Sequence, residues 1–253
     1  METITRLRTE LRMLKREDCA RGPLILVSGE HPLRRKEAEF QRELTDAAGP
    51  LLEQECAGQL SLLIAACKGK RALLPVDGYR THEEQQNLYL GSLRDNGPTY
   101  TERFVALPDC SEHQTGLAVD MAKKEPRIDP ICPFFPDSGR CGEFRRLAPD
   151  FGFIERYPAG KEAITGVAHE PWHFRYVGRP HARLITDSGL TLEEYRQFLT
   201  GFREGRPLHT PDGSAEIYYL EAEGDETPVE LPVGREVRLS GDNCGGFIVT
   251  VRL

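Results

Sequence analysis

Two short stretches of the chain carry the side chains that a hydrolytic metal centre needs. Residues 111–120 read SEHQTGLAVD, and a later stretch reads EPWH. A catalytic zinc ion takes three protein ligands from His, Asp, Glu or Cys, keeps one position open for water, and works beside a carboxylate that accepts the proton of that water. One set of residues fills these roles: His113, Asp120 and His173 as ligands, with Glu170 as the base.

The second stretch also spells HEPWH, which matches the H-E-x-x-H motif of helical zinc proteases. That motif needs both histidines on one face of a helix, whereas Pro171 lacks the N–H of a helix interior and clashes with the preceding turn. The residues that follow, 174–177, are aromatic or β-branched with one arginine, which favours a strand. We therefore expect His173 on a strand with Glu170 at its start, and we leave His169 outside the ligand set.

The first stretch can supply two ligands only if the chain folds back. Fully extended, the seven steps from His113 to Asp120 would span about 23 Å, too far for both side chains to reach one ion. Gly116 is the residue that permits a reversal. Beyond it, Gly116, Ala118 and Asp120 share one face of a strand, and the small neighbours of Asp120 leave room for a metal and its water.

A third element follows the apolar run 72–76 and reads DGYRTHEEQ. Thr81 and Glu84 match the capping box of a helix that we expect to end near Asp95. Arg80 then lies just before the helix. A rigid strand-turn-helix that holds a planar cation can direct positive charge at a developing oxyanion.

Taken singly, these residues have ordinary explanations. His113 would be a loop histidine, Asp120 a strand end and His173 a partly buried strand residue with a hydrogen-bond partner. These explanations weaken when the three elements occur together in one chain.

Together the three elements resemble the zinc D-alanyl-D-alanine peptidases of the VanX, VanY and VanXY type, which are associated with vancomycin resistance. The shared pattern is S-x-H-x(6)-D followed by E-x-x-H, with G-Y-R-S/T-x-x-x-Q upstream, and the resemblance covers roughly residues 22–200. It implies a Zn²⁺ ion held by His113, Asp120 and His173, with Glu170 as the catalytic base.

The same resemblance implies further roles around the substrate. Arg80 would steady the scissile carbonyl as it becomes tetrahedral, and Gln85 and Ser111 would contact the substrate, Ser111 at the C-terminal carboxylate. A segment that reads FGFIERYP also resembles the family, so we expect Tyr157 and Arg156 at the substrate. From the residues alone, Tyr157 would be a core or pocket-wall aromatic, and Arg156 fits a structural ion pair equally well.

The implied activity is hydrolysis of the terminal D-Ala-D-Ala bond of the free dipeptide, of peptidoglycan pentapeptide precursors, or of both. An L,D-carboxypeptidase that trims muramyl tetrapeptides is the alternative enzyme, because the metal site is shared and stereochemical preference depends on pocket shape. A metal-holding peptide-binding module without turnover is the third interpretation, against which the presence of both Glu170 and Arg80 argues.

Composition places this chemistry in an ordinary globular protein of 253 residues, 39% hydrophobic and 29% charged. The net charge is −7 and there is no polybasic run, so nucleic acid and anionic membrane surfaces are not expected partners. A small polar peptide substrate is compatible with this charge.

Three observations favour a cytoplasmic location. Residues 1–16 contain no apolar stretch typical of a secretory signal, and nowhere do 18 apolar residues follow one another. The seven cysteines form no C-x-x-C pair, which fits a reducing compartment. Cys132 and Cys141 flank a loop, where a second zinc site or a disulfide is the alternative to free thiols.

The elements and the resemblance together imply an α+β fold: a small central antiparallel sheet flanked by helices carrying a single zinc site, with a short C-terminal β appendage. We expect the catalytic domain at 22–203, a linker at 204–213 and the appendage at 214–253. Three runs in the appendage suggest strands, at 216–222, 235–239 and 247–253. Forty residues are too few for an independent core, so the appendage should pack on the catalytic domain or on a second subunit.

Residues 1–21 form the remaining region. Ile4, Leu7, Leu11 and Leu14 recur at intervals of three and four, which predicts an amphipathic helix. This helix should dock on the catalytic domain. Self-association through its apolar stripe, which would give a homodimer, is the alternative.

Overall fold

The computed structural model describes residues 8–46 and 49–253, which divide into two compact units. The central unit spans Val27–Tyr195. The terminal unit combines the described residues before Val27 with Arg196–Leu253, so segments from both ends of the chain belong to it. The division falls inside one helix, α8 (Leu192–Leu199).

The central unit is built on a four-stranded antiparallel sheet with the order β4-β5-β7-β6. The strands are β4 (Leu73–Asp77), β5 (Ala118–Lys123), β6 (Phe153–Tyr157) and β7 (Glu170–Tyr176). The small antiparallel sheet expected from the sequence is therefore confirmed. Strand β7 contains Pro171 and begins at Glu170, which also confirms that HEPWH does not form a helix.

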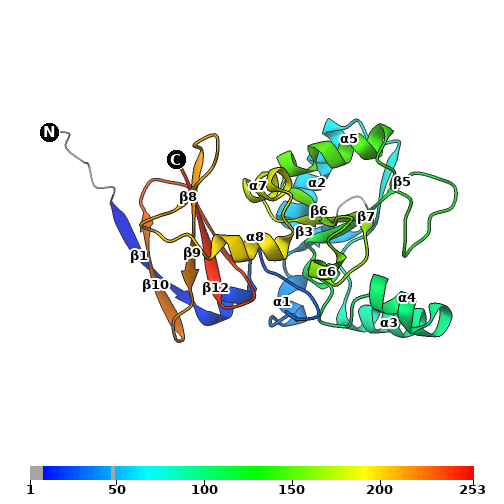
Figure 1. Cartoon of the computed structure of the whole chain (residues 1–253), viewed down its shortest axis with the longest axis horizontal. Coiled ribbons are helices and arrows are strands. Elements are labelled where there is room, and N and C mark those ends of the chain that lie inside the picture. The colour runs from blue at the N-terminus through cyan, green and yellow to red at the C-terminus, as the bar shows by residue number, and fades with distance from the viewer. Residues whose placement is uncertain (1–7, 47–48) are drawn as a thin grey trace. The chain divides into compact units, whose positions relative to one another are not determined.

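Helices surround this sheet (Figure 1), with α2, α5 and α7 on one side and α3 and α4 beyond the other. The α-helices of the unit are α1 (Glu37–Gln41), α2 (Gln54–Ala66), α3 (His82–Asn96), α4 (Pro98–Phe104), α5 (Gly139–Leu147), α6 (Glu162–Thr165) and α7 (His181–Ser188). Two 3₁₀-helices, η2 (Glu112–Thr115) and η3 (Ala148–Phe151), and a hairpin of β2 (Leu44–Asp46) and β3 (Leu51–Glu53) complete it. Within the described ranges, no helix has both the length and the hydropathy needed to cross a bilayer.

The alternation of side chains along β7 separates the core from the functional face. Phe174 is fully buried, and its ring centroid lies 4.9 Å from that of Phe144 on α5. Its neighbour His173 points to the opposite face, because successive residues of a strand alternate. One face of the sheet is thus packed with aromatic rings, and the other carries polar residues.

The terminal unit contains a second antiparallel sheet, in the order β11-β12-β9-β8, and a two-stranded pair, β1-β10. The strands are β1 (Thr9–Lys15), β8 (Leu208–His209), β9 (Ala215–Glu221), β10 (Glu226–Pro232), β11 (Val237–Gly241) and β12 (Gly246–Arg252). The three expected strands are present with shifted bounds. Strand β10 was missed because Pro228 and Pro232 demote a strand pattern, and the expected linker 204–213 instead contributes β8 to the sheet.

The amphipathic helix expected over residues 1–21 is wrong for the described part of that segment. Thr9–Lys15 forms strand β1, which pairs antiparallel with all seven residues of β10 (Figure 1), and η1 (Arg16–Ala20) follows. Leu14 is buried, whereas Leu11 is 68% exposed. The available edge of β10 outweighs the helical spacing, because tertiary pairing overrides local propensity. Ile4 and Leu7 lie outside the described residues.

The N-terminal segment also contributes residues to the core of the C-terminal β region. Leu14 and Cys19 belong to the same buried cluster as Val229, Phe247 and Val249. The terminal unit therefore has an apolar core of its own. The observed boundary between the units, at Tyr195 and Arg196, differs from the expected end of the catalytic domain at residue 203. The helical stripe expected to mediate self-association is absent from the described residues.

Candidate active site

The register of the central sheet brings two of the candidate ligands together. Asp120 of β5 lies directly opposite His173 of β7, and on its other side opposite Asp77 of β4. Directly opposed residues of antiparallel strands project from the same face. These three residues, which we call the polar row, therefore lie side by side although His173 is 53 positions from Asp120 in the chain.

The reversal expected between His113 and Asp120 is present. His113 lies on η2, which is followed by its capping residue Gly116 with φ +72°, and β5 begins two residues after this glycine. A Cβ atom at Gly116 would lie 2.6 Å from Leu44 Cδ2, so both the conformation and the space favour glycine there. The turn carries the His113 ring back over Asp120, with His113 Nε2 3.4 Å from Asp120 Oδ2.

The three candidate ligands fit a zinc ion. One donor atom from each of His113, Asp120 and His173 lies within 4.8 Å of the others, and all three residues are buried. His113 Nδ1 lies 2.7 Å from the carbonyl oxygen of Gly78. It therefore donates its proton there and leaves the Nε2 lone pair facing Asp120. Two imidazole nitrogens and one carboxylate are a donor set that suits zinc.

The polar row attracts positive charge. His173 Nδ1 lies 2.9 Å from Asp120 Oδ1. Burial opposes the negative charge of Asp120, but His113 and His173 outweigh burial and hold the pKa of its carboxyl well below the usual range. Burial also disfavours a charged His173, yet Asp120 raises the pKa of that imidazole to about 10. A divalent cation would satisfy the same attraction in place of the proton.

Glu170 lies beside the ligands without belonging to their cluster. Its Oε2 is 3.9 Å from His173 Nδ1, and its side chain is buried at the first position of β7. Burial raises the pKa of Glu170 to about 8. A carboxyl with such a raised pKa can hold a proton near neutrality, and a nearby cation would favour its ionised form.

The strand-turn-helix that carries Arg80 forms as expected. The Thr81 hydroxyl accepts the backbone N–H of Glu84 at 3.1 Å, and the Glu84 carboxylate accepts the Thr81 N–H at 2.9 Å. Helix α3 begins at His82, directly after Thr81. The Arg80 guanidinium donates to Asp77 of the polar row and to Gln85 of α3, which together fix its orientation.

Gln85 makes two hydrogen bonds within the protein, and its expected contact with the substrate stays a prediction. Its Oε1 accepts from Arg80, and its Nε2 donates to the carbonyl of Ala106 at 2.7 Å. Both ends of the amide are thus used within the protein. Gln85 touches the cavity wall, but its hydrogen bonds serve to hold Arg80.

A cavity of about 380 Å³ lies beside His173 of the polar row, which forms part of its wall. This volume lies within the usual range for small-molecule sites. Its wall includes seven of the residues singled out from the sequence: Arg80, Gln85, Ser111, His113, Tyr157, Glu170 and His173. The Tyr157 ring centroid lies 5.0 Å from that of His173. Residues 28–31, which the sequence did not indicate, form another part of the wall.

Arg156 is buried behind the cavity, and it is absent from the described wall. Its guanidinium forms ion pairs with Glu112 at 2.7 Å and Glu193 at 2.6 Å. Of the two interpretations left open by the sequence, the structure favours the ion pair. Burial opposes the charge of Glu112, but Arg156 and Arg175 hold the pKa of its carboxyl well below the usual range.

His169 and the cysteines, which the sequence did not place among the zinc ligands, lie outside the ligand cluster. His169 Nε2 lies 3.2 Å from Glu155 Oε1 and belongs to no ligand cluster among the described residues. None of the seven cysteines, all of which lie in the described ranges, forms a disulfide, and the Cys132 thiol lies 3.2 Å from the Tyr100 hydroxyl. No disulfide or second zinc site therefore forms around Cys132 and Cys141 in the described chain.

The sequence also matches a known protein family. Residues 49–179 match the family described as VanY, D-alanyl-D-alanine carboxypeptidase. The chain belongs to the VanY family. It is 45% identical over 179 residues to VanXYC of Enterococcus gallinarum, a bifunctional D-Ala-D-Ala dipeptidase and carboxypeptidase, and the match covers 70% of this chain and 94% of that enzyme.

Solved structures of two VanY-family relatives agree with this assignment. The D,D-dipeptidase VanXYg, crystallised with a phosphinate analogue of D-Ala-D-Ala, is 40% identical, with a TM-score of 0.93 over 97% of this chain and all of that chain. A point mutant of the D,D-pentapeptidase VanY from a VanB-type resistance cassette, in complex with Zn(II), is 33% identical. Its TM-score is 0.56, over 69% of this chain and 98% of that chain.

Proposed function

We propose that this VanY-family protein is a zinc-dependent D,D-peptidase that hydrolyses the terminal D-Ala-D-Ala bond of the free dipeptide, of peptidoglycan pentapeptide precursors, or of both. The observation that carries the proposal is the convergence of His113, Asp120 and His173, together with a cavity that the two histidines line with Glu170 and Arg80. The names of the relatives, a dipeptidase with a D-Ala-D-Ala analogue and a bifunctional dipeptidase and carboxypeptidase, support the substrate class.

His113, Asp120 and His173 would hold the zinc ion. When bound, zinc acidifies water and polarises the scissile carbonyl. Glu170 accepts the proton of the attacking water and passes it to the departing amine nitrogen, because its carboxyl lies beside the ligands and is screened from solvent. Bond cleavage then leaves one free carboxylate and one free amine.

Arg80 supplies hydrogen bonds to the oxygen that gains negative charge. Asp77 and Gln85 fix its guanidinium before the substrate arrives, so little reorganisation is needed during the reaction. The proposed substrate contacts are Ser111, Gln85 and Tyr157, which line the same cavity, with Ser111 at the C-terminal carboxylate.

Side-by-side assays test the activity. The purified protein, stripped with a chelator and reloaded with Zn²⁺, is incubated with D-Ala-D-Ala, a muramyl pentapeptide and a muramyl tetrapeptide, and released D-alanine is measured. We expect release from the dipeptide, the pentapeptide or both, and none before zinc is restored. Cleavage of the tetrapeptide alone would establish the L,D-carboxypeptidase instead. Zinc binding with no cleavage of any substrate would establish the binding module.

The cytoplasmic location is a prediction that rests on the sequence. Cell fractionation tests it, and the expected result is recovery in the cytoplasmic fraction. Light scattering on the purified protein distinguishes the monomer of 28.5 kDa from the homodimer, which the sequence left as the alternative.

A further inference from the structure

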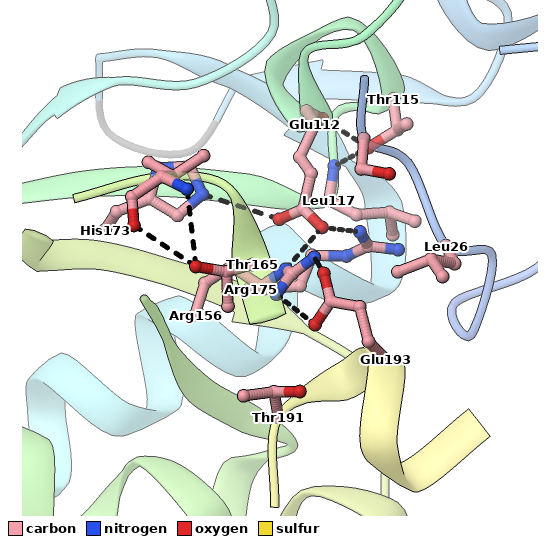
Figure 2. A network of polar contacts seen from close by, with 12 residues as sticks. Leu26, Glu112, Thr115, Leu117, Arg156, Thr165, His173, Arg175, Thr191 and Glu193 are labelled. Atoms are coloured by element: carbon pink, nitrogen blue, oxygen red, sulfur yellow. Dashed lines mark hydrogen bonds and ion pairs between the residues drawn. The ribbon is translucent and has the colours of Figure 1, made fainter. Parts of the chain in front are cut away.

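We infer that Glu112 is a positioning residue that holds the imidazole of His173 in the orientation needed to bind the metal. The inference rests on the proposed function of His173 as a zinc ligand. Glu112 lies between Ser111 and His113 in the chain, inside the ligand motif. Figure 2 shows its carboxylate between the His173 ring and the guanidinium groups of Arg156 and Arg175.

The first step concerns the two nitrogens of the His173 ring. Nδ1 lies 2.9 Å from Asp120 Oδ1, and Nε2 lies 3.5 Å from Glu112 Oε2. A neutral imidazole carries a single N–H, and the other nitrogen offers its lone pair. With Glu112 as acceptor, the proton stays on Nε2 and the Nδ1 lone pair faces the metal position. A carboxylate behind a ligating histidine fixes the ring and strengthens its donor atom.

The second step concerns what holds Glu112 itself. Its Oε1 accepts from Arg156 Nε and from Arg175 Nη1, each at 2.7 Å, so this oxygen is fully used. Oε2 is thereby directed at His173 (Figure 2). The Glu112 side chain is fully buried, which excludes water as a competing donor.

The third step concerns charge balance in the network formed by Glu112, Arg156, Arg175 and Glu193. Arg156 also pairs with the Glu193 carboxylate, at 2.9 and 2.6 Å, so two negative groups face two positive ones. A balanced network can remain charged when buried, whereas an isolated carboxylate cannot. Arg156 and Arg175 therefore hold the Glu112 carboxylate in place, with Oε2 toward His173.

His113 provides an internal contrast. Its non-ligating nitrogen donates to a backbone carbonyl, that of Gly78, which no substitution can remove. The corresponding nitrogen of His173 depends on a side chain. Substitution at Glu112 should therefore loosen one ligand of the site and leave the other in place.

The first experiment compares Zn²⁺ affinity in Glu112→Gln and Glu193→Gln, measured by competition with a chromophoric chelator. Both variants remove one negative charge from the same network, but only Glu112→Gln removes the carboxylate behind His173. We expect the dissociation constant for Zn²⁺ to rise about 10–100-fold in Glu112→Gln, and to change less than threefold in Glu193→Gln. A Zn²⁺ affinity of Glu112→Gln equal to that of the wild type would overturn the positioning role. So would equal losses of affinity in the two variants.

The second experiment needs no variant. Long-range ¹H–¹⁵N correlation spectra of the zinc-loaded wild type report which nitrogen of His173 carries the proton. We expect a protonated Nε2 and a metal-bound Nδ1, and the reverse assignment would refute the inference. Wild-type D-alanine release is measured in parallel, because its absence would count against the proposed function while leaving the ring orientation established.

Discussion

Each unit buries a carboxylate beside strands of its sheet, and the partners of the two carboxylates differ. Asp242 in the terminal unit accepts three backbone N–H groups at 2.8–2.9 Å, from residues 244–246, and also pairs with Arg196 and Tyr219. Asp120 in the central unit faces two imidazoles. Fixed donors make the first carboxylate a structural anchor. The imidazoles beside the second carboxylate can give up a proton, so a metal cation can bind there in its place.

The largest effect should come from Glu170→Ala in the central unit. The variant should keep bound zinc but lose about 10²–10⁴-fold in kcat on the best substrate, because general-base assistance is removed. Metal analysis and steady-state kinetics check the two parts. Glu162→Ala, at an exposed position of α6, is the control and should behave as wild type. Near-normal turnover in Glu170→Ala would show that another group accepts the proton.

Arg80→Lys should follow, with a loss of about 10²–10³-fold in kcat, since a lysine keeps the charge but cannot bond Asp77, Gln85 and the substrate together. Arg94→Lys, an exposed position paired with Asp95, is the matched control. A rise in KM alone would instead indicate that Arg80 contributes to substrate binding and not to the transition state.

Asp242→Asn tests the other side of the comparison. Loss of the charge should reduce the free energy of unfolding by about 1–3 kcal/mol and leave kcat unchanged. Burial alone would raise the pKa of Asp242, but the backbone N–H groups outweigh burial and lower it. Its contribution is therefore complete above its unfolded-state pKa and is lost as the pH falls through the lowered folded-state pKa.

Thermal unfolding of the wild type and of Asp242→Asn at several pH values measures this contribution. The gap in Tm between them should narrow as the pH is lowered, and Asp95→Asn at an exposed carboxylate should show little gap at any pH. A fall in kcat in Asp242→Asn would contradict a purely structural role and break the distinction between the two units.

The smallest effect should come from Thr81→Ala at the start of α3. The capping hydroxyl accepts the Glu84 N–H, and its loss should cost about 1 kcal/mol in the free energy of unfolding. Thr81→Ser keeps the hydroxyl and should restore most of the loss. Urea unfolding curves measure both, and equal midpoints for Thr81→Ala and wild type would show that the Glu84 carboxylate alone is sufficient to cap the helix.

The comparison also explains which parts of the molecule could be predicted from the sequence. Local rules were sufficient where neighbours along the chain determine structure, as in the capping box of Thr81, the reversal at Gly116 and the strand that contains Pro171. They failed for Thr9–Lys15, because its partner β10 comes more than two hundred residues later and no local pattern reports it.

The site shows the same limit. The positions of His113, Asp120, His173 and Glu170 follow a recognisable spacing, and the structure brings all four together. The role of Glu112 was missed, because only the folded chain reveals which charges surround it. A charged residue inside a ligand motif, next to His113, was the available signal.

The polar row has a consequence for how this protein can change. Since β5 pairs with β7 residue by residue, deleting one residue before Asp120 would turn its carboxylate to the aromatic side of the sheet and abolish the site. The stretch between β5 and α5 is under no such constraint, because its length does not enter the pairing. Insertions there can reshape the approach to the cavity while the chemistry stays intact, so new substrate ranges should arise by loop length before they arise by changes in the strands.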